Sequence, residues 1–109
     1  GGGVGDWSLE LRDRLERLFV DGGLAYARWL TEQGRPAEAD AVALRVIGRD
    51  SLNEEAWRLR MISHTRRGER PQAIRLYQQL TALLAQEMDD EPDPTTAELF
   101  ERILAGDDV

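Results

Sequence analysis

The sequence predicts an all-α fold, in which two helix hairpins form a right-handed stack with a long first helix and a short C-terminal capping helix. Four long segments repeat apolar residues at spacings of three and four, and no segment of any length alternates with period two. The phrase "GRPAEA" (34–39) also returns 34 residues later as "GERPQA" (68–73). A repeat at that distance predicts a helix–turn–helix unit that occurs twice.

The first helical segment is long and has one predicted core face. This face consists of Leu11, Leu15, Leu18, Phe19, Ala25, Tyr26, Trp29 and Leu30. Asp6 is a suitable N-cap for the segment. Gly22 and Gly23 in its middle could mark either a break or a close approach by another helix. Because the apolar spacing keeps its phase across the two glycines, we expect a continuous helix.

The second helix follows a short turn. Gly34 is predicted to end the first helix with a left-handed C-cap, and Pro36 suits the first turn of the next helix, where no N–H is needed. The core face of the second helix is predicted to contain Ala39, Val42, Ala43, Val46 and Ile47.

The third helix is expected to run from Asn53 to about Arg67 and to end at Gly68. Its start lies in "RDSLNEEAW" (49–57), where Ser51 and Glu54 have the spacing of a capping box. Acidic side chains in this first turn would also complement the positive end of the helix dipole.

The last two helices are separated by "MDDEPDP" (88–94). The fourth helix is expected to begin near Pro71, with a core face of Ala73, Leu76, Tyr77, Leu80, Leu83 and Leu84. Asp93 and Pro94 are predicted as N-cap and first residue of the final helix. That helix would cover the stack with Leu99, Phe100, Ile103 and Leu104.

A 34-residue helix–turn–helix period is typical of tetratricopeptide repeats. Trp57 and Tyr77 stand where such repeats often have aromatic residues, and Ala39 and Ala73 stand where two helices of a hairpin touch. Each amphipathic hairpin needs a neighbour to cover its apolar face, so we interpret the repeated phrase as the turn within a stacked hairpin.

Three stretches resemble one family more closely. They are "DSLNEEAWRLRM" (50–61), "GERPQAIRLYQQLTALL" (68–84) and "EMDDEPDPTTAELFERIL" (87–104). All three are similar to the bacterial transcriptional activator domain, the helical half of activators of the antibiotic-regulatory-protein (SARP) type. The opening "W…LRDRLERLF" resembles the first helix of that family, so the resemblance covers about residues 7–105.

The resemblance implies a non-catalytic interaction and regulatory module of a larger bacterial transcriptional regulator. Such a module acts through a protein partner or self-association, with a winged-helix domain expected upstream to bind DNA. A generic tetratricopeptide-like scaffold in an unrelated signalling or envelope protein remains the alternative. The sequence upstream of Gly1 would distinguish the two hypotheses.

Length and composition exclude further classes of function. The chain has 109 residues, enough for one domain. We expect residues 1–6 to be a flexible linker or cloning remnant, 7–105 the domain, and 106–109 a frayed tail. The net charge of −7 predicts poor binding to nucleic acid. No apolar run reaches the roughly 20 residues of a membrane span, so we expect no membrane contact. The lack of cysteine is compatible with a reducing compartment, and we expect a cytoplasmic location.

No catalytic, cofactor or metal site is expected. The chain has no cysteine and a single histidine, His64, for which a packed structural role is predicted. Asp89, Asp90 and Glu91 lie in an acidic stretch that lacks the spacing of a calcium-binding loop. The three tryptophans, Trp7, Trp29 and Trp57, are predicted to lie in the core. Without a nucleophile and base in a recognisable set, we do not expect an enzyme.

A concave groove is the candidate binding surface, because one helix of each hairpin lines such a groove in this repeat class. The groove residues predicted from their repeat positions are Leu24, Arg28, Thr31, Arg58, Ile62, Thr65 and Arg66. An exposed Ile62 between arginines would suit a protein partner. The alternative is that Ile62 packs against the first hairpin.

Overall fold

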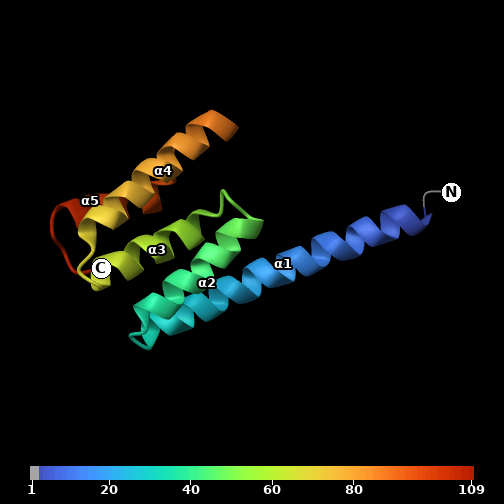
Figure 1. Ribbon diagram of the computed structural model, residues 1–109. Helices are drawn as coiled ribbons and strands as arrows, with labels where there is room; N and C mark the ends of the chain where they lie inside the picture. The colour runs from blue at the N-terminus through green and yellow to red at the C-terminus, as the bar shows by residue number, and fades with distance from the viewer. Residues whose placement is uncertain (1–2) are drawn as a thin grey trace.

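The computed structural model describes residues 3–109, with side chains described from Trp7 onward. Within residues 3–109 it contains five helices and no strand: α1 (Gly3–Glu32), α2 (Pro36–Arg49), α3 (Glu54–Arg66), α4 (Arg70–Met88) and α5 (Pro94–Leu104) (Figure 1). Each of the first four helices packs on the next, and α5 covers α3 and α4. The prediction of an all-α stack of hairpins with a capping helix is confirmed.

The N-terminal half of α1 extends away from the other helices (Figure 1). The helix is continuous through Gly22 and Gly23, as the unbroken apolar spacing predicted. It begins at Gly3, so Asp6 lies inside the first turns and its assignment as the N-cap is wrong. Residues 3–6, expected as part of a linker, are therefore helical.

The predicted core face of α1 is largely wrong. The buried residues are Val20, Leu24, Ala27 and Leu30, of which only Leu30 was predicted. The other seven members of the predicted face are exposed. The reason is that small residues decide the contact: Ala27 is fully buried, and Gly23 lies directly against Val46 of α2. A bulkier face could not approach α2 so closely.

The two repeated turns have the predicted backbone. Gly34 has φ +71° and Gly68 has φ +76°, the left-handed conformation that ends a helix. Pro36 is the first residue of α2, and Pro71 lies in the first turn of α4. The 34-residue repetition therefore marks the two inter-helix turns.

The start of α3 is capped by Asn53 rather than by the predicted capping box. The Asn53 side chain accepts a hydrogen bond from the backbone N–H of Ala56 at 3.1 Å. The Glu54 carboxylate instead accepts from the backbone N–H of Asp93 at 2.9 Å and from the Thr96 hydroxyl at 2.7 Å. The Glu54 carboxylate is therefore engaged with α5 and not with Ser51. Its two hydrogen bonds link the beginnings of α3 and α5.

The main core lies between α3, α4 and α5. Its buried residues are Trp57, Met61, Ala73, Leu76, Leu80, Leu84, Leu99 and Ile103. Phe100 stacks on Tyr77 with ring centroids 3.9 Å apart. The predicted burial of Leu104 is wrong, since this side chain is 51% exposed. A second, smaller core joins α1, α2 and the start of α3.

Of the three tryptophans, only Trp57 is buried, and its indole N–H donates to the Ser51 carbonyl at 2.9 Å. Trp7 is 65% and Trp29 is 47% exposed, so their prediction as core residues is wrong. Both lie on α1 outside its buried face.

Arginines from three helices hold the C-terminal end, where a frayed tail was expected. The carbonyls of Asp107, Asp108 and Val109 accept hydrogen bonds from Arg70, Arg102 and Arg66, respectively.

Among the described residues, no helix is both long enough and apolar enough to cross a membrane.

Candidate functional site

A surface hollow of about 340 Å³ lies between α3 and α5. We call it the α3–α5 hollow. Its lining residues are Glu55, Arg58, Leu59 and Ile62 of α3 with Thr95, Glu98, Leu99 and Arg102 of α5. Leu59 and Leu99 are buried and Ile62 is half-buried, whereas Glu98 and Arg102 are exposed. The hollow thus combines an apolar base with charged groups of both signs.

The sequence places both sets of lining residues by the same rule. On α3 and again on α5 they occupy positions i, i+3, i+4 and i+7, which form one face of a helix. Hydrogen bonds fix the two faces relative to each other. Arg58 donates to the Thr96 hydroxyl at 2.9 Å, and that hydroxyl donates to Glu54. The geometry of the hollow therefore depends on a small polar network as well as on apolar packing.

Three of the predicted groove residues belong to or adjoin this hollow. Arg58 and Ile62 line it. The Arg28 guanidinium lies 3.3 Å from the carboxylate of Glu55 and extends the charged edge toward α1. Ile62 also packs against the main core between α3, α4 and α5. The alternative expectation had placed it against the first hairpin, whose core does not include it.

The other four predicted residues do not form part of it. Leu24 and Thr65 are buried, so their assignment to a binding surface is corrected. The Thr31 hydroxyl donates to the Ala27 carbonyl within its own helix. Arg66 donates to the Thr31 carbonyl at 3.0 Å and the Val109 carbonyl at 2.8 Å, a structural tie between α1, α3 and the chain end.

Sequence reasoning missed the contribution of α5. Thr95, Glu98, Leu99 and Arg102 were not predicted as site residues, because positions were assigned by repeat and the last helix was treated only as a cap. The signal was nevertheless present, since α5 repeats the spacing of the lining residues of α3. Whether a partner binds at this hollow remains a prediction.

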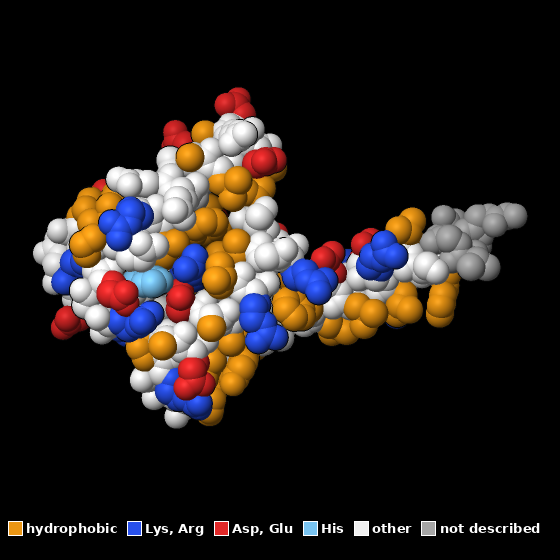
Figure 2. Space-filling model, in the orientation of Figure 1, with side chains coloured by type: hydrophobic (Ala, Val, Ile, Leu, Met, Phe, Trp, Pro, Cys, Tyr) orange, Lys and Arg blue, Asp and Glu red, His pale blue; other side chains and the backbone are white. Residues whose placement is uncertain are grey.

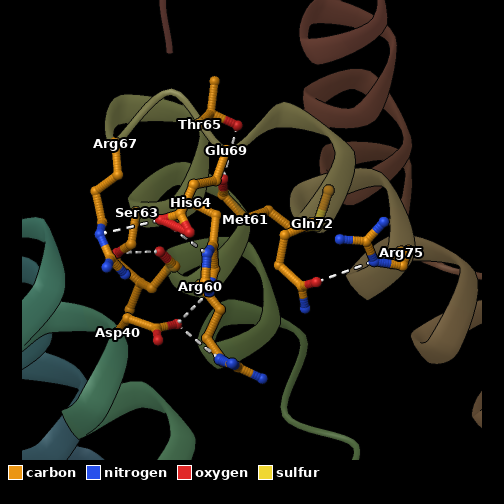
Figure 3. Close-up of polar contacts among 11 residues, drawn as sticks. Asp40, Arg60, Met61, Ser63, His64, Thr65, Arg67, Glu69, Gln72 and Arg75 are labelled. Carbon is orange, nitrogen blue, oxygen red and sulfur yellow. Dashed lines mark hydrogen bonds and ion pairs between the residues drawn. The ribbon is translucent and has the colours of Figure 1, made fainter.

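A second polar cluster surrounds His64 (Figure 3). Its imidazole is buried, with Nε2 3.3 Å from an Asp40 carboxylate oxygen and Nδ1 3.6 Å from a Glu69 oxygen. Arg60 donates to Asp40 at 2.7 Å, and Arg67 lies 3.2 Å from Glu69. The cluster links α2, α3 and the turn before α4.

The polar contacts of this cluster have a structural role, because they hold α2, α3 and the turn before α4 together. The hydroxyls beside His64 are committed to their own helix: Ser63 donates to the Leu59 carbonyl and Thr65 to the Met61 carbonyl, both at 2.8 Å. Among the described side chains, no group of three or more His, Asp or Glu residues could hold a metal ion. The buried position of His64 agrees with the packed role expected for it.

A family model described as the bacterial transcriptional activator domain matches residues 1–104, which confirms the resemblance seen in the three quoted stretches. No curated protein and no solved structure matches the chain.

Proposed function

Because the chain belongs to the bacterial transcriptional activator domain family, it is a module of a transcriptional regulator, and we propose that it acts there through protein contacts and without catalysis. The contacts are made with a protein partner or with a second copy of the regulator. The family match favours this hypothesis over a generic scaffold in an unrelated signalling or envelope protein. As part of a regulator of transcription, the module works in the cytoplasm.

The α3–α5 hollow is the observation that carries the proposal. Its apolar base, formed around Leu59 and Leu99, lies among the charged side chains of Arg58, Glu98 and Arg102. Protein interfaces typically combine an apolar centre with a polar rim in this way. Because the lining carries two acidic and two basic residues, we expect a partner segment with an apolar anchor and mixed charges rather than a polyanion.

The net negative charge of the chain disfavours binding to DNA. Duplex DNA is bound first through neutralisation of its phosphates, and a chain of net charge −7 repels them on average. Arg28, at the edge of the hollow, is also paired with Glu55 at 3.3 Å. We therefore assign promoter binding to another domain of the regulator.

A titration of fluorescent duplex DNA with the chain tests this assignment. The anisotropy is measured at physiological salt and again at low salt. We expect no detectable binding at physiological salt. Tight binding that weakens as salt is added would contradict the proposal, because it would show a phosphate-binding surface on this chain.

A further inference from the structure

One face of α1 is apolar and exposed along most of the helix. We call it the α1 stripe: Leu11, Leu15, Leu18, Gly22, Ala25 and Trp29. Leu15 is 56% and Leu18 is 63% exposed. The stripe lies on the side of the helix opposite to the buried residues Val20 and Leu24. Figure 2 shows apolar side chains along the edge of the extended helix, away from the body of the protein.

The other residues that the structure describes leave this stripe uncovered. The body-facing side of the same part of α1 carries Asp13, Glu16 and Arg17, which line an open hollow with Arg49 and Asp50. These charged residues turn the extended half of the helix so that its polar side faces α2 and its apolar side faces outward. An apolar face of this length on a solvent-exposed helix indicates an interface.

The spacing of the stripe identifies the kind of partner. The intervals between its members alternate between four and three residues, the heptad pattern of a two-stranded coiled coil. In that pattern Leu15, Gly22 and Trp29 occupy a positions, and Leu11, Leu18 and Ala25 occupy d positions. A helix with this period needs another helix as its neighbour.

We propose that the α1 stripe binds a second copy of this chain, with the two α1 helices antiparallel and the two-fold axis between Glu16 and Arg17. This inference deepens the proposed function, because it names self-association as one of the protein contacts. The closed two-fold arrangement places the free N-terminal half of each α1 along the outer side of the partner's C-terminal half. The bodies then lie at opposite ends of the helix pair, each on the side of α1 that faces away from the other helix.

Side-chain size supports the antiparallel direction. In this register Leu15 faces the partner's Leu18, and Leu11 faces the partner's Gly22. Each large residue beside the axis thus meets a large one, and Leu11 occupies the space left by a glycine. A parallel pair in register would place Gly22 opposite the partner's Gly22 and Trp29 opposite the partner's Trp29. That arrangement leaves a void at one layer and crowds another, and both cost stability.

Charge complementarity selects the register. The flanking residues Arg14 and Asp21 make no ion pair among the described residues. In the proposed register Arg14 lies beside the partner's Asp21, and the two-fold axis creates this pair twice. A shift by one heptad places Arg14 beside the partner's Arg28 or beside the partner's Arg14 instead. Like charges at these flanking positions oppose pairing, so the sequence favours one register.

Sedimentation equilibrium of the purified chain tests the proposal. We expect a dimer whose dissociation constant rises about ten-fold or more in Arg14→Glu and in Asp21→Arg, since each leaves two like-charge contacts. The double variant Arg14→Glu/Asp21→Arg restores the pairs and the dimer. Arg17→Glu, on the body-facing side, is the matched control and leaves the dissociation constant unchanged. Circular dichroism melts check that every variant folds.

The chain contains no cysteine, which allows a direct test of direction. Leu15→Cys and Leu18→Cys variants are mixed under oxidising conditions, and we expect the mixed disulfide to form faster than either homodimer disulfide. Faster formation of the two homodimers would overturn the antiparallel arrangement. A wild-type chain that stays monomeric at the highest soluble concentration, or a double variant that fails to restore the dimer, would overturn the proposal. None of these changes touches the α3–α5 hollow, so such a failure would leave the proposed function standing.

Discussion

Gly23 of α1 lies so close to Val46 of α2 that a Cβ atom added to the glycine would stand 2.6 Å from Val46 Cγ2. Val46 is fully buried in the smaller core, where neighbouring side chains restrict its movement. The close approach of the first hairpin is therefore a property of this glycine, and it determines which face of α1 is buried.

Gly23→Ala is expected to destabilise the protein although alanine is the better helix former. Overpacking a well-filled core costs about 1–3 kcal/mol, which exceeds the gain of up to about 1 kcal/mol in helix propensity. Gly48→Ala is the matched control, because it lies in α2 with no atom within 4 Å of an added Cβ. Chemical denaturation should show Gly48→Ala more stable than wild type and Gly23→Ala less stable. Equal stabilisation by both would contradict the close contact.

Gly68→Val is expected to lower the free energy of unfolding by more than about 1 kcal/mol. The residue has φ +76°, where a β-branched side chain is strained. Gly68→Asn is the comparison, since asparagine tolerates this conformation better and should lose less stability. The same order is expected at Gly34, with φ +71°. A valine variant as stable as the asparagine variant would show that the turn can relax.

Ile103→Ala should cost about 2–5 kcal/mol, because it removes a fully buried side chain from the core under α5. The neighbouring substitution Leu104→Ala should change stability by no more than about 0.5 kcal/mol, since Leu104 is exposed. Thermal melts of the two variants measure the difference. Similar losses at both positions would mean that α5 docks with another face.

Asn53→Ala should destabilise the start of α3 by about 0.5–2 kcal/mol through loss of the cap to the Ala56 N–H. Ser51→Ala should have little effect, because its hydroxyl caps no helix and its carbonyl, which the substitution retains, accepts from Trp57. Denaturant titrations of the pair distinguish this cap from the capping box that the sequence predicted. A larger loss at Ser51 would restore the capping-box hypothesis.

Most of the fold was predictable because local signals agree with the tertiary structure. Gly34, Gly68 and Pro36 mark turns through backbone restrictions that act wherever they occur. The core faces of α2 and α4 were also predicted, since each of these helices has one apolar side. In both cases the sequence pattern has a single structural solution.

The face of α1 could not be assigned from the pattern because the helix is apolar on two sides. The larger side chains, such as Leu15 and Leu18, predicted one face, whereas Gly23 and Ala27 allowed the closer contact on the other. The candidate site was predicted only in part, because its residues were assigned by their positions in the repeat. Leu24 was assigned to a groove by its repeat position, and the residues of α5, such as Glu98, were missed because they lie outside the repeat.

We propose that this module contributes protein contacts, through the α3–α5 hollow, to a regulator that binds DNA through another domain. The most direct test measures promoter occupancy and transcription together in the full-length regulator carrying Glu98→Arg, beside Glu101→Arg as an exposed control on the same helix that does not line the hollow. We predict that Glu98→Arg lowers transcription about ten-fold while occupancy stays unchanged, and that Glu101→Arg alters neither. Unchanged transcription, or a parallel loss of promoter occupancy, in the Glu98→Arg regulator would contradict the claim.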